Sequence, residues 1–138
     1  MSCVFCRIVQ GAEPARSVHE DEHTVAFLDL AQATRGHTLV VPRVHHRDLG
    51  DIPLDTAERV MRAAVEVSRR LTGALGAAGV NLWHASGETA WQSAFHFHFH
   101  VVPRYADGDR TPPWTEVEQP VEFLAGMARS IRAWRIEM

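Results

Sequence analysis

The stretch AFHFHFHVVPR, from Ala94 to Arg104, decides how the rest of this 138-residue chain is interpreted. His96, His98 and His100 occupy every second position, and phenylalanine or valine fills the positions between and after them. Alternation with a period of two is typical of a β-strand, so we expect the three imidazoles on one face and the apolar side chains on the other. Residues two apart on a strand lie about 6.5–7 Å from each other. The imidazoles are therefore close enough to act on one substrate or one ion.

Two kinds of functional site fit three histidines in this pattern. Histidine suits phosphoryl or nucleotidyl transfer because its pKa lies near neutrality. A neutral imidazole can attack phosphorus, and a ring nitrogen that carries a proton can bind a phosphate oxygen. The alternative is a zinc hydrolase in which all three histidines bind a catalytic metal, because His-x-His on a strand also places zinc ligands.

Composition indicates one ordinary globular domain, with 46% hydrophobic residues, 22% charged residues and a net charge of −3. The small net charge does not favour a nucleic-acid-binding surface. No segment approaches the roughly 18 continuous apolar residues of a membrane span, and the N-terminal stretch is too short and too polar for a signal peptide. We therefore expect a cytoplasmic protein whose partners include neither nucleic acid nor a membrane.

Cys3 and Cys6 form a Cys-x-x-Cys pair at the start of the chain. In a reducing compartment such a pair is a metal half-site or a redox pair more often than a structural disulfide. A redox motif is expected after a strand, at the start of a helix in a βαβ unit. Because this pair opens the chain, the sequence favours a metal site.

Local periodicities outside these motifs predict an α+β chain. Short strands are expected at residues 17–20, 24–29, 38–41 and 80–84. Helices are expected at residues 4–10, in a long segment that Asp55 or Thr56 can cap, and at residues 122–135. Core packing is the main interpretation of the long helix's apolar stripe, with contact to a second subunit as the alternative for part of it. The stripe consists of Val60, Ala64, Val67, Leu71 and Leu75.

The run from His96 to Val102 resembles the histidine-triad (HIT) superfamily of nucleotide hydrolases and transferases. Gln92-Ser93 resembles the lead-in that this family uses, and Pro103-Arg104 is compatible with its usual exit. The resemblance implies an α+β fold: an antiparallel sheet of about five strands with one long helix and a C-terminal helix. It also implies a single HIT domain over residues 1–138, with a core of about 3–104 and a C-terminal extension of about 105–138. Relatives of this kind pair as homodimers.

The resemblance implies an enzyme that cleaves at the α-phosphorus of a nucleoside phosphate conjugate. The conjugate would be a dinucleoside polyphosphate or a nucleoside phosphoramidate, with a purine as the expected base. His98, the middle histidine, would be the nucleophile, and a transient nucleotidyl-histidine would then be cleaved by water. The implied catalytic residues are His98, His100, Ser93 and His37, and the implied nucleotide-binding residues are Asp29, Leu30, Gln92, Ser93, His98 and His100.

Cys3 and Cys6 resemble the start of a zinc-binding branch of the family. There the other ligands are a histidine after a Pro-x-x element and the first histidine of the triad. In this chain these are His45 and His96, and His46 is the alternative third ligand. Two thiolates and two imidazoles form a closed tetrahedral site, so the zinc would be structural.

Two positions depart from the family pattern. Ala85 stands where many relatives have Asn or Gln, and Trp91 stands where a small residue often precedes the Gln-Ser pair. An indole at this point can narrow the phosphate cleft or stack on a base. These departures leave open a nucleotide-binding or scaffold protein with little activity. In relatives the C-terminal part approaches the partner's site, so residues 111–114 are expected near a nucleotide pocket.

Overall fold

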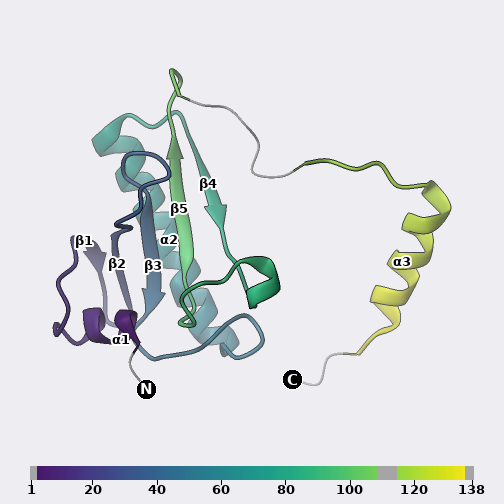
Figure 1. The fold of residues 1–138 in the computed structure, drawn as a ribbon, viewed down its shortest axis with the longest axis horizontal. Helices are drawn as coiled ribbons and strands as arrows, with labels where there is room; N and C mark the ends of the chain where they lie inside the picture. The colour runs from purple at the N-terminus through teal and green to yellow at the C-terminus, as the bar shows by residue number, and fades with distance from the viewer. Residues whose placement is uncertain (1–2, 109–114, 136–138) are drawn as a thin grey trace.

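The computed structural model describes residues 3–108 and 115–135 of the chain. Five strands form one antiparallel sheet in the order β1-β2-β3-β5-β4 (Figure 1). The strands are β1 (Ser17–Glu20), β2 (Thr24–Leu28), β3 (Thr38–Pro42), β4 (Gly79–Trp83) and β5 (Phe99–Arg104). The helices are α1 (Val4–Val9), α2 (Leu54–Leu75), the short 3-10 helix η1 (Glu88–Ala90) and α3 (Val121–Ala133). Within the two described ranges no helix has the length and apolar character needed to cross a bilayer.

The sheet buries an apolar layer on each of its two faces. On one face the long helix α2 packs across the strands (Figure 1), and its Val60, Ala64 and Val67 join a buried cluster with the strand residue Val40. On the other face α1 contributes Phe5 to a smaller cluster with β2 and β3. The core interpretation of the α2 stripe is therefore confirmed for all of its members except the exposed Leu75.

The prediction that Asp55 or Thr56 caps α2 is wrong, because the helix begins earlier. The carbonyl of Pro53 already accepts the amide of Ala57 at 2.9 Å, so Pro53 is the N-cap and makes no side-chain cap bond. Asp55 lies in the first turn, where a carboxylate favours the positive end of the helix dipole. At the other end Gly76 adopts a left-handed conformation and closes the helix, as glycine commonly does.

Only the second half of the histidine stretch pairs with neighbouring strands. β5 begins at Phe99, so His96 and His98 lie on the chain just before it. Pro103 lies inside β5 and pairs with Val80 of β4. The pairing of β3 with β5 ends at Val101, so at Pro103 only β4 lies beside β5. Proline has no amide hydrogen to donate, and this is tolerated where one neighbouring strand is absent. The expected alternation persists, since Phe97 packs in the α2 cluster while His96 and His98 contact Phe5 on the other face.

Gly36 shapes the turn that leads into β3 and His37. Its φ is +95°, and a Cβ at this position would lie 2.6 Å from Leu75 Cδ1 and 3.3 Å from Leu71 Cδ2. We expect Gly36→Ala to lower the free energy of unfolding by roughly 2–3 kcal/mol, because it adds backbone strain and crowds buried Leu71. Urea denaturation measures the loss.

Gly11→Ala is the matched control for this prediction. Gly11 also has a positive φ, of +79°, but nothing lies within 4 Å of the position that a Cβ would take there. This variant should therefore lose only the backbone contribution, about 1 kcal/mol. Equal losses in the two variants would contradict the packing argument.

Candidate active site and metal centre

Four potential metal ligands converge beside the start of α1: Cys3, Cys6, His45 and His96. The distance from Sγ to Nδ1 is 3.4 Å both for Cys3 with His96 and for Cys6 with His45, and the two Nδ1 atoms are 3.1 Å apart. Zinc bonds of about 2.3 Å to sulfur and about 2.0–2.1 Å to nitrogen place tetrahedral ligand atoms about 3.3–3.8 Å apart. Both Sγ–Nδ1 distances fall in this range and the Nδ1–Nδ1 distance lies just below it, so the four side chains are placed to hold a zinc ion. His46 is not among the clustered ligands, and its carbonyl accepts the amide of Phe97.

His96 is oriented as a metal ligand by a bond on its far side. Its Nε2 lies 2.8 Å from the carbonyl oxygen of Pro42, which can only accept, so Nε2 carries the proton and Nδ1 offers a lone pair to the cluster. Burial lowers the pKa of His96 to about 4, so the ring is neutral near pH 7. Burial and the adjacent Cys3 raise the pKa of the Cys6 thiol. A bound cation offsets the cost of holding both thiolates here.

His98 presents a lone pair from a buried, neutral ring. Its Nδ1 lies 2.8 Å from the carbonyl oxygen of His96, so Nδ1 donates and Nε2 is left unprotonated. Burial lowers the pKa of His98, which keeps the ring neutral near pH 7. The ring packs edge-on against Phe5 and against His100, with centroid distances of 5.2 Å and 4.9 Å. The side chain is therefore held in one orientation.

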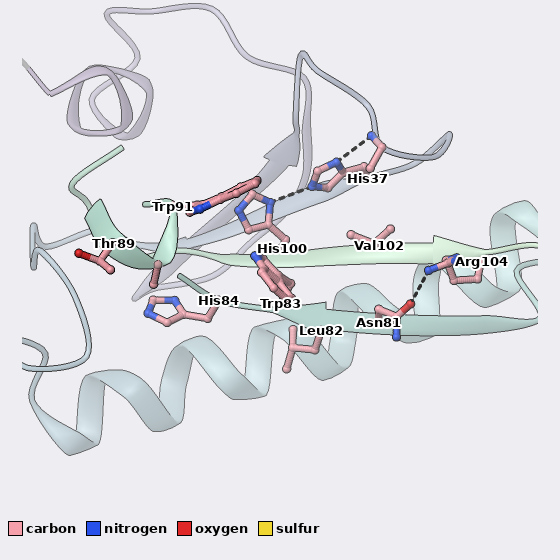
Figure 2. A pocket seen from close by; sticks show the side chains of 12 residues that line it. His37, Asn81, Leu82, Trp83, His84, Thr89, Trp91, His100, Val102 and Arg104 are labelled. Carbon is pink, nitrogen blue, oxygen red and sulfur yellow. Dashed lines mark hydrogen bonds between the residues drawn. The ribbon is translucent and has the colours of Figure 1, made fainter. Parts of the chain in front are cut away.

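His37, just before β3, forms a hydrogen-bonded pair with His100 on β5 (Figure 2). The amide of Ala33 donates to His37 Nδ1 at 3.0 Å, so the proton of His37 is on Nε2, which donates to His100 Nδ1 at 2.9 Å. His100 must then carry its own proton on Nε2. Burial, followed by the neighbouring His98 and His37, lowers the pKa of His100 to about 4. His100 is therefore a neutral N–H donor.

A cleft of about 250 Å³ brings most of the predicted site residues together. Asp29, Leu30, Ser93, His98 and His100 line it together with apolar side chains of α1 and β2. One carboxylate oxygen of Asp29 accepts the amide of Ala31 at 2.9 Å, and the other lies 3.6 Å from His37 Nε2. His37 itself stands behind His100 and does not line this cleft.

Gln92 is buried, and its side chain is engaged inside the protein. Its Oε1 accepts the amide of Gly87 at 2.7 Å, and its Nε2 donates to the carbonyls of Arg47 and Ala94 at 2.7 Å and 3.1 Å. Its backbone amide donates to the carbonyl of Gly87. These bonds fix the shape of the loop that carries Ser93. The expected contact of Gln92 with phosphate stays a prediction.

His84, to which the sequence pattern assigned no role, holds the backbone of His98, the predicted nucleophile. Its Nδ1 donates to the carbonyl oxygen of His98 at 2.9 Å, and its Nε2 accepts the Ser86 hydroxyl at 2.6 Å. Its ring stacks on Phe97 at a centroid distance of 4.5 Å. The partner of His84 is a main-chain carbonyl, so no motif in the sequence could have identified this contact.

The sequence profile of the HIT domain matches residues 10–107 of this chain. The chain belongs to the HIT family. This confirms the resemblance drawn from the histidine pattern, and the five-stranded sheet with its long helix and C-terminal helix confirms the predicted α+β HIT fold. The assembled cluster of Cys3, Cys6, His45 and His96 supports membership of the zinc-binding branch.

Relatives of this HIT protein include Protein hit of Bacillus subtilis, which is 40% identical over 108 residues, or 78% of this chain and 74% of that protein. The crystal structure of a HIT family member from Bacillus subtilis matches with a TM-score of 0.90 and 33% identity, covering 100% of both chains. A Zn-bound histidine triad family protein from Mycobacterium smegmatis matches with a TM-score of 0.77 and 37% identity, covering 97% of this chain and 99% of that one.

Proposed function

We propose that this HIT protein is a nucleotide hydrolase or nucleotidyl transferase that acts at the α-phosphorus of a nucleoside phosphate conjugate. The main observation behind the proposal is that two adjacent imidazoles differ in the protonation of Nε2. His98 has an unprotonated Nε2, whereas His100 has a protonated Nε2. Both residues line the cleft of about 250 Å³, which we call the nucleoside cleft because we propose that it holds the nucleoside. Nucleophilic attack on phosphorus needs a lone pair, and the charge that develops on the phosphate oxygens needs a donor.

The reaction proceeds in two displacements. In the first, Nε2 of His98 forms a bond to the α-phosphorus, the bond to the leaving group breaks, and the leaving atom takes the electron pair. Ser93, which is exposed at the edge of the nucleoside cleft, donates to a phosphate oxygen or to the leaving group. In the second, water or another acceptor attacks phosphorus and the phosphorus–nitrogen bond returns its electron pair to His98. Water gives the nucleoside monophosphate.

The nucleoside is recognised by the remaining walls of the nucleoside cleft. Asp29 lines it and provides a carboxylate for the two ribose hydroxyls, an arrangement of charge-assisted bonds. Phe5, Ile8 and Phe27 form an apolar wall that suits a base, and Leu30 contributes at the opening. The expectation of a purine conjugate, either a dinucleoside polyphosphate or a phosphoramidate, rests on the family resemblance.

Zinc is proposed as a structural cofactor, held by Cys3, Cys6, His45 and His96. With four protein ligands the ion has no open position for water or substrate, so it stabilises the fold and takes no part in the reaction. The alternative, a catalytic metal on all three triad histidines, is not supported by the geometry. Among the residues that the structure describes, no ligand cluster contains His96, His98 and His100 together.

A turnover screen over adenosine and guanosine conjugates tests the proposed activity. Nucleotides are separated by chromatography, and a base-quenched reaction is searched by mass spectrometry for a nucleoside monophosphate attached to His98. We expect monophosphate release and the adduct. Nucleotide binding without turnover of any conjugate would instead favour the binding or scaffold protein that Ala85 and Trp91 leave open.

We also propose that the protein forms a homodimer, on the basis of the surface of α3. Figure 1 shows α3 apart from the sheet, and none of its residues is buried. Its exposed apolar side chains are Val121, Phe123, Leu124, Met127 and Ile131, and Trp134 follows the helix. Exposed apolar surface of this kind marks association sites, and two-fold dimers are the commonest solution.

We expect light scattering at micromolar concentration to give twice the 15.4 kDa chain mass. A single-chain mass would contradict the dimer. The segment from Thr111 to Trp114, expected near a nucleotide pocket, lies outside the described residues. Deleting everything after Asp109 tests this expectation, because unchanged Michaelis constants in a folded truncated protein would show that the tail takes no part in substrate binding.

A further inference from the structure

A second and larger cleft, of about 760 Å³, opens on the other side of His100. We call it the tryptophan cleft because Trp83 and Trp91 line it, together with Asn81, His84, Val102 and Arg104. His100 lines both this cleft and the nucleoside cleft. A phosphate group bound at His98 and His100 is therefore adjacent to two separate spaces, and the transferred nucleoside of the proposed reaction fills only one of them.

Strands β4 and β5 form the floor of the tryptophan cleft. Trp83 pairs with His100 and Asn81 pairs with Val102 in antiparallel register, so these four side chains stand on one face of the sheet. At the far end Arg104 donates to the side-chain oxygen of Asn81 at 2.9 Å. Figure 2 shows Trp83 and Trp91 on either side of His100, with Asn81 and Arg104 further along the strands.

Trp91 combines two unfavourable properties at the edge of this cleft. Its φ is +73°, and it is the only non-glycine residue with a positive φ in the described parts of the chain. A bulky residue adopts this conformation only under strain. The indole is also 88% exposed, so burial within the chain does not offset the strain. Strain and an exposed aromatic ring in one residue beside the reacting groups indicate a ligand contact.

We propose that Trp83 and Trp91 form a leaving-group subsite that binds a planar aromatic ring, such as the base of a second nucleotide. The inference rests on the proposed function, in which the transferred nucleoside occupies the nucleoside cleft. Indole rings stack on flat rings and accept any base. None of the described residues that line the tryptophan cleft is acidic. Arg104 lies four residues, or about 13 Å, along β5 from His100, so the far end of the cleft is cationic and favours an anionic ligand.

A comparison of two substrates measures the contribution of the second ring to kcat/KM. Diadenosine tetraphosphate and adenosine tetraphosphate share the adenosine, the α-phosphorus and the phosphate chain, and only the former carries a second nucleoside. Its leaving group is ATP, whereas that of the other is tripolyphosphate. After division by two for its two equivalent α-phosphorus atoms, we expect kcat/KM of diadenosine tetraphosphate to be roughly 5- to 150-fold higher, the range that base–aromatic stacking supports.

Trp91→Gly is the decisive variant, because glycine removes the indole and adopts a positive φ without strain. Its melting temperature should equal or exceed that of the wild type, which excludes unfolding as the cause of any change. The ratio of the two kcat/KM values should fall toward one, and Trp83→Ala should lower it as well. Leu54→Ala, which removes an exposed apolar side chain at the start of α2 that lines neither cleft, is the control and should keep the wild-type ratio.

A wild-type ratio near one, or a ratio that neither tryptophan variant changes, would overturn the subsite. If the wild type cleaves neither substrate, the proposed function fails, and the subsite is then decided by calorimetric binding of the same two nucleotides. Tighter binding of diadenosine tetraphosphate that depends on Trp91 supports the subsite without the reaction. Equal affinities of the two nucleotides overturn it.

Discussion

The His98→Ala variant is expected to lose turnover by about three or more orders of magnitude while it keeps its fold and its nucleotide binding. The reason is that Nε2 of His98 forms the bond to phosphorus in the proposed reaction, and no other described imidazole offers an unprotonated nitrogen in the same position. His100 uses Nδ1 to accept from His37, so its remaining nitrogen carries a proton. Single-turnover kinetics with a conjugate identified in the screen measures the loss.

His23→Ala is the matched control for this experiment. His23 lies in the turn between β1 and β2, away from both clefts beside His100, and its side chain is 41% exposed. It should keep the wild-type rate, which shows that removal of a histidine is not harmful in itself. A His98→Ala protein that folds and retains more than about a tenth of the wild-type rate would rule out His98 as the nucleophile.

Loss of the metal site should have the largest effect on stability. Protein purified without chelator is expected to carry about one zinc per chain, and Cys3→Ser should lower the melting temperature by about 10 °C or more. The ion would connect α1 to His45 after β3 and to His96 before β5, three segments that lie far apart in the sequence. Elemental analysis and scanning calorimetry measure the two quantities.

The neighbouring histidines provide the control for the metal site. His45→Ala should lose the zinc, whereas His46→Ala should retain it, because His45 alone of the two has a ring nitrogen in the cluster. A chelator should lower the melting temperature of the wild type and leave that of Cys3→Ser unchanged. Metal-free protein after such a purification, or zinc retained by His45→Ala but lost by His46→Ala, would refute the assignment.

The sequence was sufficient to predict features that follow from a repeating pattern or from a motif of side chains. The period of two in the histidine stretch predicted that Phe97 and the histidines face opposite sides, and this holds although only Phe99–Arg104 is a ladder strand. The alternation persists at His96, Phe97 and His98 although these residues precede the ladder, because Phe97 packs against α2 while the two histidines pack against Phe5. The Cys-x-x-Cys pair likewise indicated a metal site before its histidine partners could be placed.

Features that depend on main-chain partners could not be predicted. His84 contacts the carbonyl of His98, and Gln92 bonds to backbone groups of three residues, and neither kind of partner has a side-chain signature. The positive φ of Trp91 could not be predicted either, because tryptophan has no preference for the left-handed conformation. The start of α2 was misplaced because Asp55 and Thr56 match the preferred caps, whereas Pro53, a poor cap, holds the position.

The loop between β4 and β5, residues 84–98, has a consequence for how this family can diversify. It carries the proposed nucleophile, His98, and both departures from the family pattern, yet its shape is held by side-chain bonds of His84 and Gln92 and not by a strand ladder. Substitutions at its exposed positions therefore leave the sheet intact while they reshape the space beside phosphorus. A gene duplicate of such a protein can acquire a new substrate range by changing a few loop codons, with the reaction itself inherited unchanged.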